Sequence, residues 1–264
     1  MNRIDQKFKE LRAAGKKAFI AFITAGDPDL ETTEALVLSF EKSGVDIVEL
    51  GVPFSDPLAD GRTIQAASFR SLQKGTTLLK ILEMVKRIRQ HSSIPIALMT
   101  YYNPVFHFGD RAFVDQAKAS GVDGVIIPDL PVEEAADLRS YSLEAGLSTI
   151  FFLAPTTSLD RMQAAVDAAT GFVYFVSVTG VTGSKVVVAS DIAAKIRSAR
   201  RLTDKPICVG FGVSTPDQVR SIAAIADGVI VGSAIVKEIE RNAGKKGLVM
   251  HVSRFVKELA EVLQ

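Results

Sequence analysis

Short apolar runs rich in β-branched side chains alternate along the chain with longer stretches in which apolar residues recur at helical spacing. A strand covered on both faces reads as a continuous hydrophobic run, so the short runs predict buried strands. We expect strands at residues 18–24, 47–52, 95–101, 124–129, 148–154, 172–178, 206–211 and 228–231. The periodic stretches predict helices at residues 32–42, 78–90, 111–120, 133–145, 159–169, 189–201, 215–224 and 248–263.

The number of strand–helix repeats indicates a closed barrel. Alternating strands and helices imply right-handed crossovers and a parallel sheet, and eight such units in ~250 residues are typical of the α/β fold called the (β/α)8 or TIM barrel. Ile4, Phe8 and Leu11 recur at helical spacing before the first strand and predict an extra N-terminal helix. A doubly wound open sheet is the alternative. Without a linker or low-complexity segment, the sequence predicts one domain over residues 1–264.

Composition excludes several classes of protein. Hydrophobic residues make up 47% and charged residues 23%, with a net charge of +1, so there is no basic stripe for nucleic acid. No apolar run reaches the ~18–20 residues of a membrane span, and the N-terminus lacks the apolar segment of a secretory signal. A lone Cys208 excludes an internal disulfide framework, so we expect a cytoplasmic protein. Three scattered histidines predict no metal site.

Glu49 is the first candidate for chemistry, since the active sites of such barrels form at the C-terminal ends of the strands. Side chains alternate along a strand, so Glu49 shares a face with Ile47, and Val48 and Leu50 share the other. If Glu49 faces the barrel interior, desolvation raises its pKa and it can act as a general acid. A Glu49 that faces outward and pairs with a helix cation is the alternative.

The loop after this strand adds two further carboxylates, Asp56 and Asp60. Pro53 and Pro57 stiffen the loop and hold these acids in place. The alternative for Asp60 is an N-cap of the following helix, and Asp56 is also suited to a protein interface.

Glycine-containing turns at 210–214 and 232–234 predict a phosphate site, with a short helix beginning at Ser233. Neither turn contains Lys or Arg, which favours binding by backbone N–H groups. The glycine-rich loop at 179–185 is suited to a lid, the alternative being a long connection. No strand contains a lysine for imine chemistry, so acid–base work by two carboxylates on a phosphorylated substrate remains.

Several segments together resemble the tryptophan synthase alpha subunit family, in order and spacing through nearly the whole chain. They are FITAGDP (22–28), VELGVPFSDPLADG (48–61), PDLP (128–131), GVTG (180–183) and GFGVS (210–214). The resemblance implies a lyase that cleaves indole-3-glycerol phosphate to indole and glyceraldehyde-3-phosphate in tryptophan biosynthesis. It gives Glu49 the proton transfers to the indole ring carbon and from the glycerol hydroxyl, and Asp60 the proton on the indole nitrogen.

The resemblance also implies the substrate site, which needs no cofactor of its own. The indole pocket would be lined by Phe22, Met99, Tyr101, Ile127, Tyr174 and Phe211. The phosphate would be held by Gly183, Gly212, Gly232 and Ser233, and Thr182 would position Asp60. Taken singly, several of the apolar residues are equally suited to the barrel core.

The family implies a partner. Its members pass indole to a beta subunit that uses pyridoxal phosphate, in an alpha2-beta2 heterotetramer. The loop residues expected at this contact are Pro53, Asp56, Asn103, Pro104 and Asp129.

Arg62 departs from the family, which usually has proline after the Asp60-Gly61 pair. Proline is preorganised at a helix start, whereas arginine there faces the positive end of the helix dipole. We expect a looser loop, or an Arg62 that pairs with Asp60 or Asp56. Two other functions remain open from the residues alone: another phosphate-binding barrel enzyme, and a regulatory partner of a beta subunit with little catalysis of its own.

Overall fold

The strands form a closed barrel. The computed structural model describes residues 2–176, 185–210 and 212–263, and within them eight parallel strands pair in sequence order, with β1 against β8. They are β1 (Ala18–Thr24), β2 (Ile47–Gly51), β3 (Ile96–Met99), β4 (Gly124–Ile126), β5 (Ser148–Leu153), β6 (Val173–Val176), β7 (Ile207–Gly210) and β8 (Gly228–Val231). The predicted TIM barrel is confirmed, and the open sheet is excluded because β1 and β8 close the ring.

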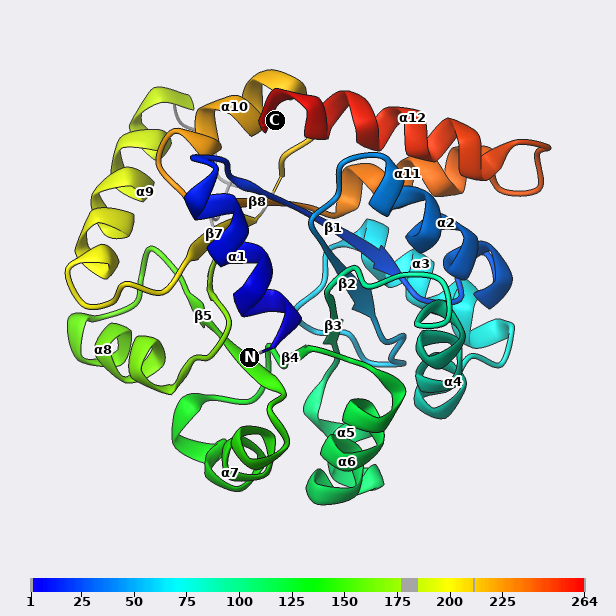
Figure 1. Ribbon diagram of the computed structural model, residues 1–264, viewed down its shortest axis with the longest axis horizontal. Helices are drawn as coiled ribbons and strands as arrows, with labels where there is room; N and C mark the ends of the chain where they lie inside the picture. The colour runs from blue at the N-terminus through cyan, green and yellow to red at the C-terminus, as the bar shows by residue number, and fades with distance from the viewer. Residues whose placement is uncertain (1, 177–184, 211, 264) are drawn as a thin grey trace.

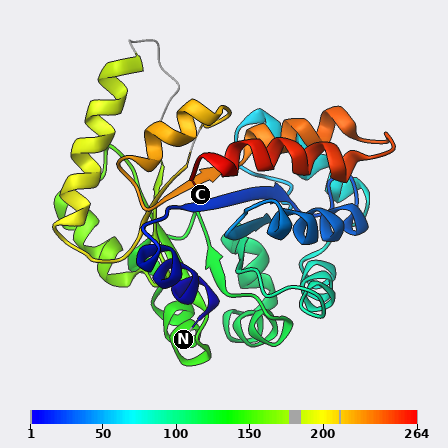
Figure 2. The ribbon, with the colours of Figure 1, turned by 45° about the horizontal axis from the view of Figure 1, so that its top comes forward.

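Apart from α1, the described helices lie around the outside of the barrel (Figures 1 and 2). The described helices are α1 (Arg3–Ala13), α2 (Leu30–Lys42), α3 (Arg62–Gln73), α4 (Leu78–Ile88), α5 (Tyr102–Phe108), α6 (Asp110–Ser120), α7 (Ala136–Ala145), α8 (Leu159–Ala168), α9 (Lys185–Arg200), α10 (Pro216–Ala223), α11 (Ser233–Asn242) and α12 (Leu248–Ala260). Two short 3-10 turns are η1 (Val132–Glu134) and η2 (Glu261–Leu263).

Two helices fall outside the predicted stretches. In α3 the buried residues are Ala67, Ser68 and Ser71, so the helix has no strong apolar stripe. In α5 the helix has only 7 residues and one buried residue, Val105, which is too short for a periodic signal. The predicted fourth strand was too long at its C-terminal end, since pairing stops at Ile126, before Pro128, which has no backbone N–H to donate.

Side chains of the strands divide between two cores. Ile47 belongs to a cluster inside the barrel, whereas Val48 and Leu50 belong to the larger cluster between strands and helices. The inner cluster includes Ile4 and Phe8 of α1, which lies across one end of the barrel (Figure 1). The predicted N-terminal helix is therefore confirmed, and it closes the end of the barrel where the strands begin.

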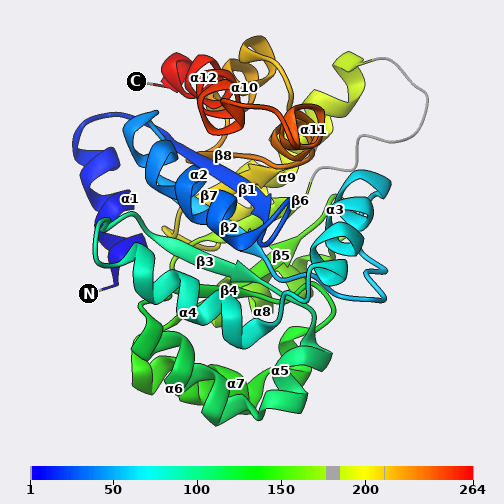
Figure 3. The same ribbon diagram turned by 90° about the vertical axis from the view of Figure 1, so that its right-hand side faces the viewer.

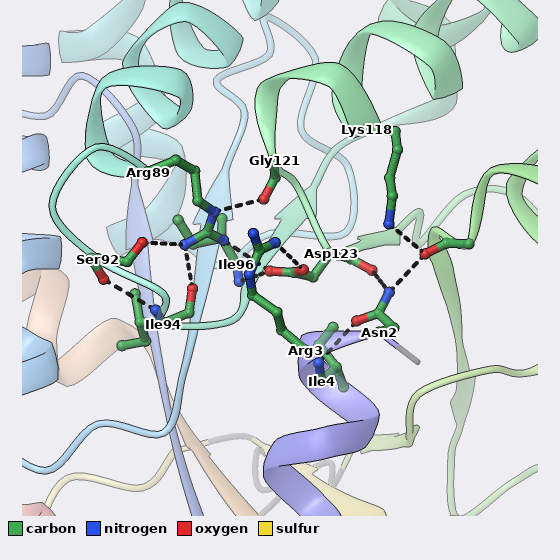
Figure 4. A network of polar contacts seen from close by, with 11 residues as sticks. Asn2, Arg3, Ile4, Arg89, Ser92, Ile94, Ile96, Lys118, Gly121 and Asp123 are labelled. Carbon is green, nitrogen blue, oxygen red and sulfur yellow. Dashed lines mark hydrogen bonds and ion pairs between the residues drawn. The ribbon is translucent and has the colours of Figure 1, made fainter.

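Asp123, which directly precedes β4, ties α1 to this end of the barrel (Figure 4). Its buried carboxylate accepts hydrogen bonds from Arg3 at 2.9 Å, from Arg89 at 2.8 Å and from the Ile96 N–H at 2.9 Å. Its backbone carbonyl accepts a further bond from the Asn2 side chain at 2.6 Å. One buried acid therefore joins the N-terminal helix to β3, β4 and the end of α4.

Candidate active site

A cavity of about 530 Å³ opens at the C-terminal ends of the strands, where α3 lies, and α1 lies at the opposite end of the barrel (Figure 3). Its apolar walls are formed by Phe22, Met99, Phe152, Tyr174, Val176 and Ile230. Its polar lining includes Asp60, Arg62, Gly212, Gly232 and Ser233. The shape and composition suit a ligand with a flat apolar part and a polar or charged end.

Glu49 lies beside this cavity and is fully buried. It alternates with the outward-facing Val48 and Leu50, and its neighbour in register on β1, Phe22, lines the cavity. Neither carboxylate oxygen has a hydrogen-bond partner in the described part of the chain. Desolvation by burial raises the pKa of Glu49 from 4.5 to about 8, so the group carries its proton at neutral pH. Of the two orientations that the alternation left open, the inward one is found, and the outward alternative is wrong.

Asp60 lines the cavity and is bonded to Tyr101. The Tyr101 hydroxyl accepts a hydrogen bond from the Ala59 N–H at 2.9 Å and donates one to the Asp60 carboxylate. Burial raises the pKa of Asp60 above 3.8, and the bond from Tyr101 opposes this rise. Asp60 is not an N-cap, because Gly61 occupies that position and makes no side-chain cap bond. The two acids thus differ among the described residues: Glu49 has no hydrogen-bond donor there, and Asp60 has one.

A buried ion pair holds α3 in position over the cavity. Arg70 of α3 binds the buried carboxylate of Asp27 through two bonds of 2.8 Å, and it also contacts Glu240 of α11 at 2.7 Å. Paired bonds of this kind fix geometry as well as adding energy. They anchor the helix that begins at Arg62, directly after Asp60.

Gly212, Gly232 and Ser233 meet at one side of the cavity. Gly232 is the N-cap of α11 and Ser233 is its first residue, so the N-terminus of this helix opens toward the ligand space. Gly212 has a φ of 68°, a conformation that L side chains rarely adopt. A helix N-terminus next to such a glycine turn suits an anion held by backbone N–H groups.

Three of the predicted site residues, Phe211, Thr182 and Gly183, lie outside the described residues, as does most of the predicted lid. Tyr101 borders a small recess that it shares with Asp60 and Met99, rather than the main cavity. Ile127, which the resemblance implied for the indole pocket, is not among the residues that line the cavity. It belongs to the cluster between strands and helices, because Ile126 takes the inward position of the alternation.

Sequence reasoning missed some lining residues, among them Phe152 and Val176. Both lie near the C-terminal ends of predicted strands, so strand position was a signal that could have identified them. Pro128, in the PDLP motif, takes the cavity position that we expected for Ile127.

The predicted pairing of Arg62 is also wrong. Within the described ranges, Arg62 forms no ion pair with Asp60 or Asp56, and it is exposed at the cavity edge.

The loops predicted to meet a partner lie together. Phe54 stacks on Tyr101 with ring centroids 5.2 Å apart, and the Tyr102 N–H donates to Asp129 at 2.9 Å, which joins the loops after β2, β3 and β4. Of the predicted contact residues, Asp56, Asn103 and Asp129 are exposed and Pro104 is half-buried, whereas Pro53 is buried. Pro53 is therefore packed inside this loop in the isolated chain.

A groove beside these loops, of about 630 Å³, exposes large apolar side chains. Leu58 is 84% exposed and Phe69 of α3 is 63% exposed, and both line this groove. Phe54, Pro57 and Leu72 complete its apolar lining. A contiguous apolar surface of this kind indicates a protein partner.

No group of three or more His, Cys, Asp and Glu residues that could hold a metal ion occurs in the residues that the structure describes. Over the same residues, no helix has the length and apolar character needed to cross a membrane.

Comparisons with known proteins agree on one family. The family model described as "Tryptophan synthase alpha chain" matches residues 8–264. A tryptophan synthase alpha chain of Geotalea daltonii is 51% identical over 246 residues, which cover 93% of this chain and 93% of the relative. One of Geobacter sulfurreducens is 51% identical over 263 residues, which cover 100% and 99%. The structure of tryptophan synthase subunit alpha from Legionella pneumophila is similar with a TM-score of 0.92 at 36% identity, covering 100% of this chain and 98% of that one.

Proposed function

This chain belongs to the tryptophan synthase alpha chain family, and we propose how its own residues divide the reaction of that family. The chain is a carbon–carbon lyase of tryptophan biosynthesis that cleaves indole-3-glycerol phosphate to indole and glyceraldehyde-3-phosphate. The observation that carries our assignment of roles is the buried Glu49 carboxyl, protonated at neutral pH beside a cavity that Asp60 lines.

Glu49 acts first as an acid and then as a base. Its carboxyl gives a proton to the indole ring carbon that bears the glycerol chain, which makes that carbon tetrahedral. The resulting carboxylate takes the proton of the adjacent glycerol hydroxyl. The carbon–carbon bond then breaks, the electrons of that bond return to the ring, and the carbon that carried the hydroxyl becomes the aldehyde. Glu49 ends the cycle protonated again. Rotation about its side-chain torsions is the smallest movement that brings the carboxyl to the substrate.

Asp60 handles the proton on the indole nitrogen. While the ring carbon is protonated, positive charge develops on the nitrogen, and a carboxylate beside it stabilises the charge or accepts the proton. The hydrogen bond from Tyr101 favours the ionised form of Asp60 and opposes the effect of its partial burial. Returning the proton to the nitrogen releases neutral indole.

The remaining lining fits the two ends of the substrate. The apolar walls suit the flat indole ring, and Gly212, Gly232 and Ser233 suit the phosphate. The proton transfers use only side chains of this chain, so we propose that its reaction needs no cofactor. The cytoplasmic location expected from the sequence stays a prediction.

Replacement of Asp60 by asparagine is expected to lower kcat for indole release at least about 100-fold, the usual contribution of one acid–base group, with KM changed about threefold or less. The measurement is indole formation from indole-3-glycerol phosphate by the purified chain, with and without a beta subunit. Asp217→Asn, a fully exposed acid on α10, is the matched control. An Asp60→Asn chain with parental kcat would remove Asp60 from the mechanism. No indole release by the parental chain under either condition would favour the alternative function, a regulatory partner of a beta subunit with little catalysis of its own.

We also propose that the groove around Leu58 and Phe69, with the adjoining loops that carry Asp56, Asn103 and Asp129, docks the pyridoxal phosphate-dependent beta subunit in an alpha2-beta2 heterotetramer. The groove borders the loop that carries Asp60, so a bound partner would cover the cavity from one side. Indole would then leave toward the partner rather than into water.

The variant Phe69→Glu is expected to raise the Kd for a beta subunit at least about tenfold, because a charge would be buried in an apolar contact. Isothermal titration calorimetry measures the Kd, and sedimentation velocity gives the stoichiometry. Leu143→Glu, on α7, is the control because Leu143 is 74% exposed and lies outside the groove. Equal loss of affinity in both variants, or none in either, would place the partner elsewhere.

A further inference from the structure

Arg62 stands alone at the edge of the cavity. It is exposed, it is the first residue of α3, and it lines the cavity together with Gly212, Gly232 and Ser233. No acidic residue lies in the first turn of α3, and no described carboxylate pairs with the guanidinium. A cation at a helix N-terminus faces the positive end of the helix dipole, so this position is unfavourable without a negative partner.

The charges around this edge select for an anion. The N-termini of α3 and α11 both open on the cavity, and neither helix has an acidic residue in its first turn. The one carboxylate in the described cavity lining is Asp60, which the Tyr101 hydroxyl already binds. Two helix N-termini and one guanidinium therefore give this side of the cavity a positive potential, and the facing walls are apolar.

We propose that Arg62 is a further substrate-binding residue, which contacts the phosphate of the substrate while the N-terminus of α11 binds it from the other side. This inference rests on the proposed function, and it adds a side-chain cation to a phosphate site that the turns alone would form from backbone. Guanidinium offers paired N–H donors in the geometry that phosphate oxygens accept. The anchoring of α3 by Arg70 and Asp27 holds the backbone of Arg62 at this edge.

The alternative role, an ion pair with Asp60, is not favoured by the structure. Such a pair would favour the charged form of Asp60 and lower its pKa. The pKa of Asp60 is instead raised by burial, and among the described residues the opposing effect comes from Tyr101 and not from Arg62. Arg62 is thus available to a ligand.

The kinetic test compares Arg62→Gln, Arg62→Lys and Arg62→Pro with the parental chain at low ionic strength. We expect Arg62→Gln and Arg62→Pro to raise KM for indole-3-glycerol phosphate about tenfold, with kcat within about twofold, as for loss of one charge-assisted contact. Arg62→Lys should stay within about threefold of the parent because it keeps the charge. Added salt should shrink the difference, since exposed charges are screened.

The matched control is Arg254→Gln, which removes an equally exposed arginine from α12, outside the cavity. It should leave KM unchanged. An equal rise in KM for Arg254→Gln and Arg62→Gln would show a general charge effect and overturn the contact. A fall in kcat with an unchanged KM for Arg62→Gln would also overturn it.

Direct binding of glycerol 3-phosphate, which lacks the ring, separates this inference from the proposed function. Calorimetry is expected to give a Kd about tenfold higher for Arg62→Gln than for the parent. The same Kd for both chains would overturn the role of Arg62 and leave the backbone phosphate site intact. A parental chain that does not bind glycerol 3-phosphate would instead overturn the phosphate site itself, and the role of Arg62 with it.

Discussion

Replacement of Glu49 by glutamine is expected to lower indole release by the chain at least about 1000-fold, because one group supplies both proton transfers of the cycle. Glutamine keeps the size of the side chain but has no proton to give and no basic oxygen to receive one. Binding of glycerol 3-phosphate should stay within about twofold of the parent, since Glu49 lies outside the phosphate side of the cavity.

The same carboxyl predicts the alkaline limb of the pH profile. In the free chain the pKa of Glu49 is about 8, so kcat/KM should fall as pH rises through that value and the acid loses its proton. The acid limb should follow the ionisation of Asp60, whose pKa lies above 3.8. A value of kcat/KM for the parental chain that stays constant between pH 7 and pH 9.5 would contradict the role of Glu49 as the initial acid.

Glu49→Gln should also stabilise the fold, but only at high pH. The folded chain holds the Glu49 proton up to pH about 8, whereas the unfolded chain loses it near 4.5, so the folded state binds more protons between these values. Stability therefore falls as pH rises from 4.5 to 8, by about 4–5 kcal/mol in full, from ~1.36 kcal/mol per pKa unit. Removing the group removes that loss. We expect Tm to rise by at least about 4 °C at pH 8.5 and to change little or fall slightly at pH 5.

The difference between the two pH values is the readout, because a buried glutamine amide has its own cost at both. Glu83→Gln, an exposed acid on α4, should shift Tm equally little at pH 5 and pH 8.5. Equal Tm shifts for Glu49→Gln at the two pH values would mean that the carboxyl titrates alike in the folded and unfolded chains. This result would contradict a pKa raised by burial.

Strand periodicity predicted the barrel because each strand is covered on both sides, which makes its sequence apolar throughout. Alternation within such a strand is still informative where a charge interrupts it, because it showed that Glu49 shares a face with Ile47 and that Val48 and Leu50 share the other. Only the structure shows that the face of Ile47 is the inner one. At strand ends the signal disappears, because pairing stops before the apolar run does. The predicted fourth strand was too long for this reason, since its pairing stops at Ile126.

The position of polar groups in loops depends on contacts between distant segments, which no local pattern contains. The Tyr101 hydroxyl reaches Asp60 and Ala59 because the loop after β2 folds back over the end of β3. Arg62 was expected to loosen the loop or to pair with Asp60 or Asp56, and among the described residues it forms no ion pair with either, although Asp60 lines the same cavity. Only the folded backbone shows that Arg62 shares a cavity with Gly232, which is 170 residues away in sequence.

Replacement of Asp123 by asparagine is expected to lower the free energy of unfolding by about 3–5 kcal/mol, because it leaves a buried cation without its counter-ion. Arg89 is mostly buried, and burial lowers its pKa to about 10 against the opposing charge of Asp123. An amide at this position can accept only part of the bonds now made from Arg3, Arg89 and the Ile96 N–H. Urea-induced unfolding at pH 7 measures the change.

The loss of stability in Asp123→Asn can be compared with the loss of an exposed ion pair, and the activity of the variant tests whether this end of the barrel contributes to catalysis. Glu144→Gln breaks the exposed pair with Arg111 and should cost less than about 1 kcal/mol. Asp123 lies at the end of the barrel opposite the cavity (Figures 3 and 4). Under conditions in which the variant remains folded, Asp123→Asn should therefore keep kcat and KM within about twofold of the parent. A loss below about 1 kcal/mol would show that water or other acceptors replace the carboxylate. An Asp123→Asn chain with parental stability but a tenfold lower kcat would contradict this separation between the two ends of the barrel. The end that carries α1 would then contribute to the chemistry at the other end.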